Sequence, residues 1–466
     1  MVDLEPIFRA QHESFAASGA PGPDERLEML ALLKAGVLAD ADTLAHAVEA
    51  DFGRRAATET RLTEILTVTQ ELTHIRRHLR SWMKPLRVPV EWTLWPARAW
   101  IRYEPLGVVG VIGAWNYPIV LTLSPLANAL AAGNRVMLKL PERTPATNQV
   151  IDSLLGRLFP RTRVAVITGG ASVGEVFARL PFGHLLFTGS TAVGRQVLTG
   201  AAARLTPVTL ELGGKSPAII DHDFPLETAA SRIAAGKFLN AGQTCIAPDY
   251  VLVPRQSVEP FERHLRAAFA RLYPAGIDSP DYTWIIDRDH WERLSRLLED
   301  ASRKGARLVP LAPGRPEPVS TGRAFPPTLV YDCHPDMAIL QEEIFGPILP
   351  VLTYDTLAEA VAHVQAGPAP LALYYFGRNR KRREDVLRMT RSGGVVVNDT
   401  LLHFVENGLP FGGVGESGMG AYHGHHGFLT FSKARAVFQQ GRFSGFALLR
   451  PPYGRRTRRL LDLLIH

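Results

Sequence analysis

Short runs rich in Val and Ile alternate with helical stretches from Gly107 onward, and this alternation limits the fold more than any other property of the chain. The runs lie at 108–113, 135–139, 163–167 and 184–188, and stretches with helical periodicity lie between them at 121–132, 147–158 and 173–180. Such alternation predicts a parallel, doubly wound sheet that binds ligands at the carboxyl ends of its strands. A similar pattern returns from Lys215, with a helix at 226–240 and strands at 250–253 and 394–398. We therefore expect two consecutive α/β units that meet near 211–215.

Other patterns flank this region. Between Asp24 and Lys84 apolar residues recur at intervals of three and four, which indicates amphipathic helices. Between Pro85 and Tyr103 the pattern favours extended, edge-like strands interrupted by prolines. The chain has 466 residues, and a single core usually stops growing at roughly 250–300 residues. More than one domain is therefore expected.

The formal net charge of +7 is concentrated at the end of the chain. Beyond Gly441 six arginines stand against one acid, which gives this segment a net charge of +5. No aromatic–basic motif accompanies it, so we expect no nucleic-acid partner, while peripheral contact with an anionic membrane stays open. The residues concerned are Arg442, Arg450, Arg455, Arg456, Arg458, Arg459 and Asp462.

The two cysteines and the N-terminus indicate a reducing compartment. Cys245 and Cys333 lie far apart and show neither a disulfide framework nor metal-site spacing. The N-terminus has acids where a signal peptide needs bases, and no stretch reaches the ~18 uninterrupted apolar residues of a membrane helix. These features predict a cytoplasmic protein without a transmembrane segment.

Cys245 follows a glycine-containing turn that closes a predicted helix, in the sequence Phe-Leu-Asn-Ala-Gly-Gln-Thr-Cys-Ile. A lone cysteine is more often a buried small apolar residue than a nucleophile. The segment Val-Thr-Leu-Glu-Leu-Gly-Gly-Lys-Ser-Pro, which contains Glu211, precedes it by about one strand and one helix. Together the two segments resemble the paired signature of the aldehyde dehydrogenase superfamily.

Five further motifs extend this resemblance in the family's order over about two-thirds of the chain. The resemblance is closest to the class 3 branch, which includes bacterial coniferyl-aldehyde dehydrogenases; Asn398-Asp-Thr, His403, 419–424 and 451–454 carry that likeness. The five motifs are Gly-Ala-Trp-Asn-Tyr-Pro at 113–118, Lys139 with Pro-Glu at 141–142, Phe-Thr-Gly-Ser-Thr-Ala-Val-Gly at 187–194, Glu-Glu-Ile-Phe-Gly-Pro at 342–347 and Pro-Phe-Gly-Gly-Val-Gly-Glu-Ser-Gly at 410–418.

The resemblance implies an α/β fold with a Rossmann-like cofactor domain, a second α/β catalytic domain and a small β bridging region for oligomerisation. We assign 1–84 and 105–210 to NAD(P) binding, 211–400 to catalysis, and 85–104 with 401–466 to the bridging strands and the C-terminal tail. The bridging strands have an edge to cover, and a second subunit would cover it, so we expect a homodimer.

The implied activity is oxidation of an aldehyde to a carboxylic acid with NAD, NADP being left open. Cys245 would attack the aldehyde as a thiolate, and Glu211 would activate the water that hydrolyses the resulting thioester. Leucines and glycines around Glu211 favour this role over that of an ion-paired surface residue. Asn116, with the backbone N–H of Cys245, would stabilise the alkoxide. Spacing alone would favour Asn116 as a helix cap, since Asn is a favoured residue there.

Seven residues are the expected cofactor contacts. The loop 189–194 follows a strand and opens a helix, so its amides can face a pyrophosphate. Lys139 and Glu142 would bind the adenosine ribose, and an acid there favours NAD. Glu343 and Phe345 would hold the nicotinamide ribose and ring. The full set is Lys139, Glu142, Gly189, Ser190, Gly194, Glu343 and Phe345.

Two other patterns are weaker. The literal GxGxxG at 413–418 follows no parallel strand of a βαβ unit and has no ribose-binding acid about twenty residues later, so we do not interpret it as a dinucleotide loop. The histidines at 403, 423, 425 and 426 match no usual zinc spacing, and we expect no metal. Tyr117 and His403 are candidates for lining the substrate tunnel, with packing roles as the alternative.

Three other functions were weighed. An acylating, coenzyme-A-dependent dehydrogenase would lack the equivalent of Glu211. A structural protein on the same fold would show decay of catalytic residues, which this sequence does not. A membrane-associated fatty-aldehyde dehydrogenase remains an alternative because of the arginine-rich tail. An aromatic, coniferyl-like or medium-chain aldehyde is the expected substrate.

Overall fold

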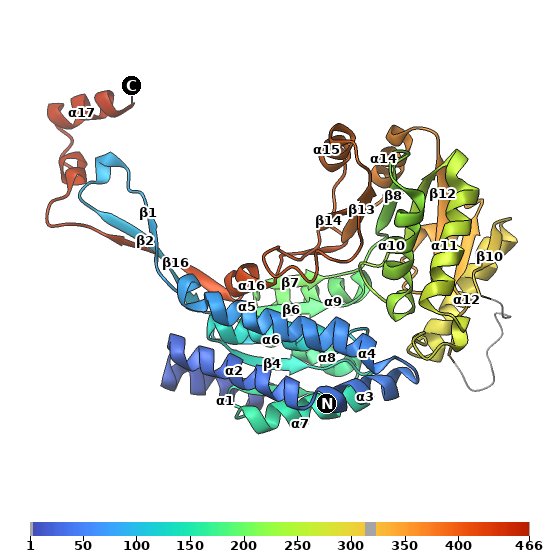
Figure 1. Ribbon diagram of the computed structural model, residues 1–466. Helices are drawn as coiled ribbons and strands as arrows, with labels where there is room; N and C mark the ends of the chain where they lie inside the picture. The colour runs from blue at the N-terminus through green and yellow to red at the C-terminus, as the bar shows by residue number, and fades with distance from the viewer. Residues whose placement is uncertain (1–2, 313–322, 466) are drawn as a thin grey trace.

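The Val/Ile-rich runs after Gly107 form a six-stranded sheet in the computed structural model, which describes residues 3–312 and 323–465 (Figure 1). We call it the cofactor sheet; its order is β15-β7-β6-β3-β4-β5, and β15 alone is antiparallel. The strands predicted at 135–139 and 184–188 have exactly those bounds. The strands are β3 Val108–Ile112, β4 Arg135–Lys139, β5 Val164–Ile167, β6 His184–Thr188, β7 Val208–Glu211 and β15 Gly418–Met419.

Helices cover both faces of the cofactor sheet because successive strand residues point to opposite sides. Val109 and Val111 pack in the same cluster as one set of helices, and Val108 and Ile112 pack with the other. α6 is buried along its whole length, which explains why its sequence is apolar all round. The first set is α2 Pro23–Ala39, α3 Ala41–Phe52, α4 Ala57–Thr60, η1 Arg61–Ile65, α5 Leu66–Trp82, α6 Val120–Ala132 and α7 Pro145–Leu158; the second is α1 Glu5–Ser18, α8 Ala171–Ala178 and α9 Thr191–Ala202.

The later strands form a seven-stranded sheet, which we call the catalytic sheet, with the order β10-β11-β12-β9-β8-β13-β14. β10 alone is antiparallel. Its strands are β8 Pro217–Ile220, β9 Tyr250–Pro254, β10 Arg307–Pro310, β11 Thr328–Tyr331, β12 Ile348–Tyr354, β13 Ala372–Phe376 and β14 Gly394–Val397. The helices around it are α10 Leu226–Phe238, η4 Arg255–Ser257, α11 Val258–Leu272, η5 Gly276–Asp278, α12 Arg288–Arg303, α13 Ala338–Gln341, α14 Leu357–Ala366 and α15 Arg380–Met389.

A third sheet projects from the body of the molecule (Figure 1). It has the antiparallel order β1-β2-β16, and most of its residues are exposed or half-buried. We call residues 85–105 and 432–465 the arm. Its elements are β1 Leu86–Val88, η2 Trp92–Leu94, β2 Arg98–Pro105, β16 Ser432–Gln439, η6 Gly445–Leu449 and α17 Arg455–Ile465.

The segment between the catalytic sheet and the arm returns to the cofactor sheet. Gly418 pairs with Glu211, and Met419 pairs with Leu210. The helix α16 Gly424–Thr430 then packs on α5 and α6. We had placed all of 401–466 in the bridging region, but 418–430 lies on the cofactor-domain side because these backbone pairs fix it there. The division into domains otherwise stays a prediction.

Candidate active site

The register of the cofactor sheet brings four strand ends to one edge. Ile112 pairs with Lys139 on one side and Phe187 on the other, and Thr188 pairs with Glu211. The loops after these ends carry Asn116 and Gly189, so residues from four separate strands converge, as expected for a doubly wound sheet.

Cys245 lies opposite, on the loop between α10 and β9. Its turn η3 (Leu239–Gly242) contains Asn240 and Ala241 in the left-handed region, with φ of 51° and 49°. The side chain of Gln243 locks the loop: it donates to the Trp284 carbonyl at 3.0 Å and accepts from the Ile286 N–H at 2.9 Å. Cys245 keeps part of its surface exposed, while its neighbours on both sides are buried. Cys245 is therefore a partly exposed residue in an otherwise buried segment.

Asn116 faces this loop rather than capping a helix. Its side-chain amide donates to the Gln243 carbonyl at 3.2 Å, two residues before Cys245. The residue that caps α6 is Ile119, and no side chain caps that helix. The contact favours the role of an amide donor beside the cysteine.

Glu211 is buried and unpaired. Its exposed fraction is 3%, and neither carboxylate oxygen has a hydrogen-bond partner among the described residues. Burial raises the pKa of this carboxyl well above its usual value. An ion-paired surface glutamate is therefore excluded, and the carboxyl keeps its proton to a higher pH than an exposed glutamate does.

Two carboxyl groups affect the pKa of the Cys245 thiol. Its limited contact with water raises its pKa, and Glu343 and Glu211 raise it further, while the backbone N–H groups of Cys245 and Ile246 oppose that change. Glu343 is also shielded from water, which raises its pKa to about 8. Cys245, Glu211 and Glu343 thus belong to one electrostatic site, although they come from separate parts of the sequence.

Lys139 and Glu142 form a partly buried pair at the end of β4. The Lys139 ammonium lies 2.7 Å from a Glu142 oxygen, and Glu142 is about half exposed. Glu142 also lines an open depression of about 720 Å³. The other residues that line it are Pro145, Ala146, Asn148, Gln149, Asp152, Thr168, Gly169 and Gly170. A ribose with two hydroxyl groups fits a carboxylate and an ammonium placed in this way.

The loop at 189–194 opens α9 as predicted, but its glycines have packing roles. The N–H of Gly189 donates to the Glu211 carbonyl at 3.0 Å, so this amide is already used. A Cβ on Gly194 would meet Leu212 at 2.7 Å, so this glycine permits close packing of α9 against the end of β7. Ser190 caps the helix through the Val193 N–H. The amides of Thr191 and Ala192 remain for a pyrophosphate at the helix N-terminus.

Glu343 and Phe345 lie between the two sheets. A Cβ on Gly213 would meet a Glu343 oxygen at 2.0 Å, which shows how closely that carboxyl approaches the loop after β7. The ring of Phe345 packs edge-to-face on Trp115, with centroids 5.4 Å apart. Both residues therefore contact loops that follow strands of the cofactor sheet, and their role toward the nicotinamide stays a prediction.

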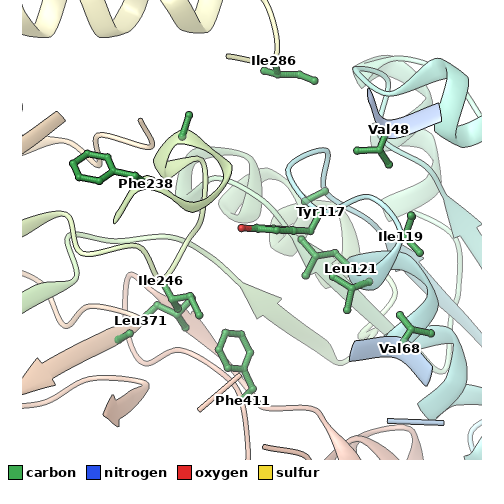
Figure 2. Close-up of a cluster of buried hydrophobic side chains, with 14 of the residues drawn as sticks. Val48, Val68, Tyr117, Ile119, Leu121, Phe238, Ile246, Ile286, Leu371 and Phe411 are labelled. Carbon is green, nitrogen blue, oxygen red and sulfur yellow. The ribbon is translucent and has the colours of Figure 1, made fainter. Parts of the chain in front are cut away.

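Tyr117 and His403 have different neighbours. The Tyr117 hydroxyl hydrogen-bonds to Thr244 at 2.7 Å. The His403 ring lies 5.6 Å from the Phe411 ring at an angle of 37°, and burial lowers the His403 pKa to about 4, so the imidazole is neutral at pH 7. Figure 2 shows Tyr117, Ile246 and Phe411 within one apolar cluster. A lining role for both side chains stays a prediction.

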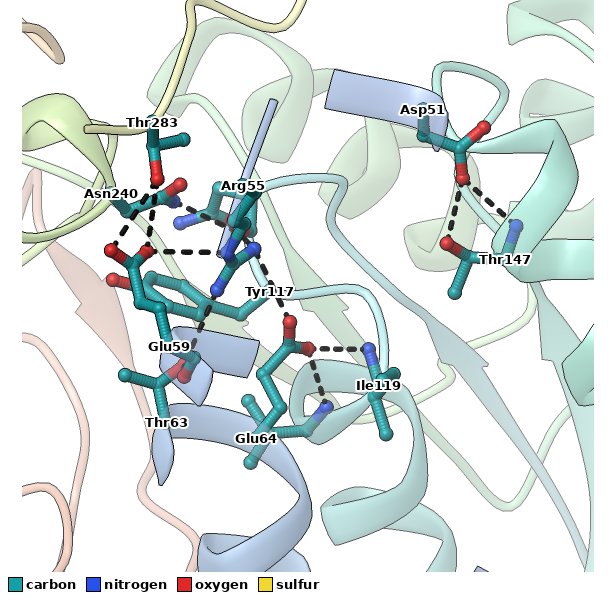
Figure 3. Close-up of polar contacts among 12 residues, drawn as sticks. Asp51, Arg55, Glu59, Thr63, Glu64, Tyr117, Ile119, Thr147, Asn240 and Thr283 are labelled. Atoms are coloured by element: carbon teal, nitrogen blue, oxygen red, sulfur yellow. Dashed lines mark hydrogen bonds and ion pairs between the residues drawn. The ribbon is translucent and has the colours of Figure 1, made fainter. Parts of the chain in front are cut away.

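The sequence did not identify a buried charge cluster beneath this site (Figure 3). Arg55 is fully buried and pairs with Glu59 at 3.3 Å and with Glu64 at 3.2 Å. It also donates to the Asn116 carbonyl at 3.0 Å, and the Asn240 side chain donates to the same oxygen. The cluster ties the Asn116 loop to the turn before Cys245. The one available signal was an arginine and two acids inside an otherwise amphipathic stretch.

Two other predicted features can be placed. The GxGxxG at 413–418 forms a tight loop leading into β15, which is antiparallel to β7, so it is not the turn of a βαβ unit. In the described residues no group of three or more His, Cys, Asp or Glu side chains has the arrangement of a metal site.

Comparisons with known proteins agree with this geometry. The family described as "Aldehyde dehydrogenase family" matches residues 2–437. A probable coniferyl aldehyde dehydrogenase from Pseudomonas aeruginosa is 49% identical, over 98% of this chain and 95% of that protein.

Solved structures show the same fold and its cofactor. The substrate-bound state of Staphylococcus aureus AldH superposes with a TM-score of 0.94 at 36% identity and covers all of both chains. The NAD⁺ complex of an aldehyde dehydrogenase from Bacillus cereus has a TM-score of 0.85 at 26% identity, over 94% of this chain and 89% of that one. The chain belongs to the aldehyde dehydrogenase family and is an NAD(P)-dependent enzyme that oxidises aldehydes to carboxylic acids.

Proposed function

We propose that Cys245 is the nucleophile, Asn116 the alkoxide donor and Glu211 the base of this reaction. The observation that carries the proposal is the unpaired, buried carboxyl of Glu211, which shares one electrostatic site with the Cys245 thiol. Burying a carboxyl group without a hydrogen-bond partner lowers the stability of the folded protein. Its presence here therefore points to a function.

The chemistry follows from these groups. The Cys245 thiol loses its proton to solvent, the thiolate bonds to the aldehyde carbon as the C=O π bond breaks, and the oxygen gains the negative charge beside the Asn116 amide and the Cys245 N–H. A bound nicotinamide supplies the acceptor for the hydride that leaves this carbon. Glu211 then takes a proton from the water that attacks the thioester, and cleavage of the C–S bond releases the acid and the Cys245 thiolate.

The cofactor contacts are also proposed. Lys139 and Glu142 hold the adenosine ribose, the α9 N-terminus including Ser190 receives the pyrophosphate, and Glu343 with Phe345 positions the nicotinamide half. Gly189 and Gly194 act by shaping this loop. The fit is supported by the free amides at the α9 N-terminus and by the Lys139–Glu142 pair beside an open depression.

Glu211→Gln tests the hydrolytic step. The variant keeps the carboxamide shape but cannot take a proton, so the thioester accumulates. Rapid mixing with aldehyde and NAD should give a burst approaching one NADH per competent site, then a steady rate about 10²–10⁴-fold below that of the wild type. Coenzyme A should not restore turnover. Wild-type steady turnover by the variant, or a wild type that requires coenzyme A, would contradict the proposal.

We further propose an aromatic, coniferyl-like or medium-chain aldehyde as substrate. The name of the Pseudomonas aeruginosa relative and the aromatic neighbours of His403, Tyr374 and Phe411, support this. Such aldehydes should give a higher kcat/KM than acetaldehyde, and equal or better values with acetaldehyde would reject the proposal.

The assembly is proposed to be a cytoplasmic homodimer. Both cysteines are free, which suits a reducing compartment. The outer edge of the eight-residue strand β16 has no partner strand among the described residues, and a second subunit would cover it. Sedimentation equilibrium should report twice the chain mass of 51.2 kDa.

A further inference from the structure

The proposed nicotinamide contacts Glu343 and Phe345 belong to a segment without regular secondary structure, residues 342–346, between α13 and β12. Phe345 has a left-handed backbone, with φ of 50°. A bulky residue adopts this conformation only where its surroundings impose it, and such residues gather at functional sites. Contacts from other parts of the chain must therefore hold segment 342–346 in its shape.

Lys215 and Asp249 form an ion pair that holds this segment. The Lys215 ammonium donates to the carbonyls of Ile339 at 2.7 Å and Glu342 at 3.0 Å. Its third donor binds one oxygen of Asp249, and the other oxygen of Asp249 accepts from the Ile344 N–H at 2.9 Å. The two side chains are 15% and 4% exposed, so the pair is shielded from water. Every N–H of the ammonium and both oxygens of the carboxylate are therefore used.

Arg293, on α12, binds the backbone of the same segment. Its guanidinium donates to the Glu343 carbonyl at 3.1 Å and to the Ile344 carbonyl. Burial raises the pKa of Glu343, while Lys215 and Arg293 oppose that rise. The charged side chains therefore fix backbone groups of three consecutive residues and also act on the Glu343 carboxyl.

The ion pair also joins the three parts of the proposed reaction site. Lys215 follows Glu211 by four residues, in the loop between β7 and β8. Asp249 follows Cys245 by four residues, in the loop that leads to β9. Because both also bind segment 342–346, one buried pair connects the loop of the base, the loop of the nucleophile and the segment of the nicotinamide contacts.

Stabilisation of the fold does not account for such a pair. The free energy needed to remove two charges from water offsets most of their attraction, so an apolar pair of the same volume often serves stability as well. An ion pair with assigned partners instead specifies one arrangement of the groups that it binds. Hydride transfer requires such an arrangement, because the reacting atoms must lie about 3–3.5 Å apart and a misplacement of about 1 Å can lower the rate by about 10²-fold.

We propose that Lys215 and Asp249, assisted by Arg293, are positioning residues that fix the nicotinamide relative to Cys245 for hydride transfer. The proposal rests on the nucleophile, base and nicotinamide contacts proposed above. The three side chains act through the backbone of the segment that carries those contacts. Hydrolysis of the thioester uses the base and water and needs no aligned nicotinamide, so loss of the pair slows the hydride step selectively.

Lys215→Met tests the proposal, because it removes all three donors and nearly keeps the length of the side chain. Rapid mixing of the full chain with aldehyde and saturating NAD should give NADH formation about 10²-fold slower than in the wild type. Deuterium on the aldehyde carbon should slow this phase further, which identifies it as the hydride step. Arg293→Met removes two hydrogen bonds to the same backbone and should slow the phase by about tenfold.

Other readouts separate positioning from general damage. Without NAD, p-nitrophenyl acetate acylates Cys245 as nitrophenolate leaves, and hydrolysis of this ester should keep its wild-type rate in both variants. Titration calorimetry should show an unchanged affinity for AMP, because the proposed adenosine contacts Lys139 and Glu142 are intact. The fluorescence emission of bound NADH should move toward that of free NADH, because the reduced nicotinamide is no longer held in one place.

Arg382→Met is the matched control. Arg382, on α15, pairs with Asp221, whose side chain is 1% exposed, and with Asp223, so the variant also breaks a buried ion pair beside the catalytic sheet. Both partners lie outside segment 342–346 and outside the Cys245 loop. The variant should lower Tm, yet NADH formation on rapid mixing should keep its wild-type rate.

NADH formation at the wild-type rate by Lys215→Met would overturn the proposal, and so would an equal loss of NADH formation and ester hydrolysis. Equal slowing in the Arg382→Met control would also overturn it. If Lys215→Met does not fold, Arg293→Met decides, and an unchanged hydride step in that variant rejects the positioning role. Failure of the proposed function looks different, because Cys245→Ala would then still form NADH and hydrolyse the ester.

Discussion

The ionisable residues around Arg55 and the carboxyl of Glu211 are both buried in this enzyme, but they differ in whether they have partners. Around Arg55 the charges are paired: Glu59 and Glu64 both contact the guanidinium, Thr283 donates to Glu59, and the N–H groups of Ile119 and Val120 donate to one oxygen of Glu64, whose other oxygen has only the ion pair with Arg55. Glu211 has no such partner among the described residues. The paired group holds loops in place, whereas the unpaired group is available for reaction.

The pKa values show the same difference. Burial raises the pKa of Glu64 only to about 7, because Arg55 and the backbone N–H groups oppose it. Burial raises the pKa of Glu211 with no opposing partner. Burial without a partner shifts the pKa of a carboxyl, which is typical of catalytic groups. Structural carboxyls are instead held in complete hydrogen-bond networks. The comparison predicts that changes in the unpaired group remove activity and that changes in the paired group remove stability.

The largest expected effect is at the thiol that shares the site of Glu211. Cys245→Ala should abolish dehydrogenase turnover, because no other group can form the thioester, and it should leave Tm almost unchanged. Cys333→Ala is the matched control, since Cys333 is the only other cysteine and is also partly buried. Steady-state NADH formation checks both. Loss of turnover in the Cys333 variant alone would show that the site is misassigned.

The next effect concerns the paired group. Arg55→Met leaves Glu59 and Glu64 buried without their cation, so urea unfolding at neutral pH should show a loss of about 3–5 kcal/mol. Loss of Arg55 raises the pKa of both acids in the folded state further, so the variant regains stability as pH falls and they take up protons. Turnover should also fall, because Arg55 holds the Asn116 carbonyl.

Arg61→Met is its control. Arg61 lies six residues later and pairs with Asp42, but both side chains are more than half exposed. Removing an exposed pair costs less than about 1 kcal/mol. Equal destabilisation by the two variants would remove the distinction between the paired cluster and an ordinary surface contact.

Local motifs in the sequence mark the residues that we propose to react, whereas no local motif marks the residues that hold them. Cys245 and Glu211 sit in local motifs, and β4 and β6 have the predicted bounds because their Val/Ile runs decide them locally. The partners of Arg55 include the Asn116 carbonyl, which lies 61 residues away along the chain, and no local pattern encodes that contact.

The same cluster explains an incorrect boundary. We predicted one helix over 226–240, but α10 ends at Phe238, and Asn240 and Ala241 are left-handed. The side chain of Asn240 donates to the Asn116 carbonyl at 3.0 Å, and its backbone N–H opposes the rise in the pKa of Glu59 that burial causes. These tertiary contacts outweigh the helical propensity of the segment, and they shape the turn that presents Cys245. The left-handed residues could not be predicted without knowing those partners.

Lys139 and Glu142 are intermediate between the two groups, because they are paired but Glu142 is half exposed. Glu142 should accept bonds from ribose hydroxyls and repel a 2′-phosphate, so the wild type should prefer NAD. Glu142→Gln should raise kcat/KM with NADP by about tenfold relative to NAD, since one like charge is removed. Asp152→Asn, in the same depression but outside the pair, should change the ratio little. A wild type with a higher kcat/KM for NADP would reject this role.

The smallest expected effect is the change in protein stability when the unpaired Glu211 is replaced. Above the pKa of an unfolded glutamate, the unfolded chain loses its proton while folded Glu211 keeps it, because its pKa is raised. Folding then becomes less favourable as pH rises toward the folded-state pKa. Glu211→Gln removes this penalty, so its Tm should equal the wild-type value near pH 4.5 and exceed it by a few degrees at pH 8.

Glu416→Gln is the control, because Glu416 is exposed and pairs with Arg195 at 3.0 Å, and its replacement should give no pH-dependent gain. A Glu211→Gln enzyme that loses stability as pH rises would mean that the carboxylate has a stabilising partner in solution, and Glu211 would then belong with Glu59 and Glu64 rather than apart from them.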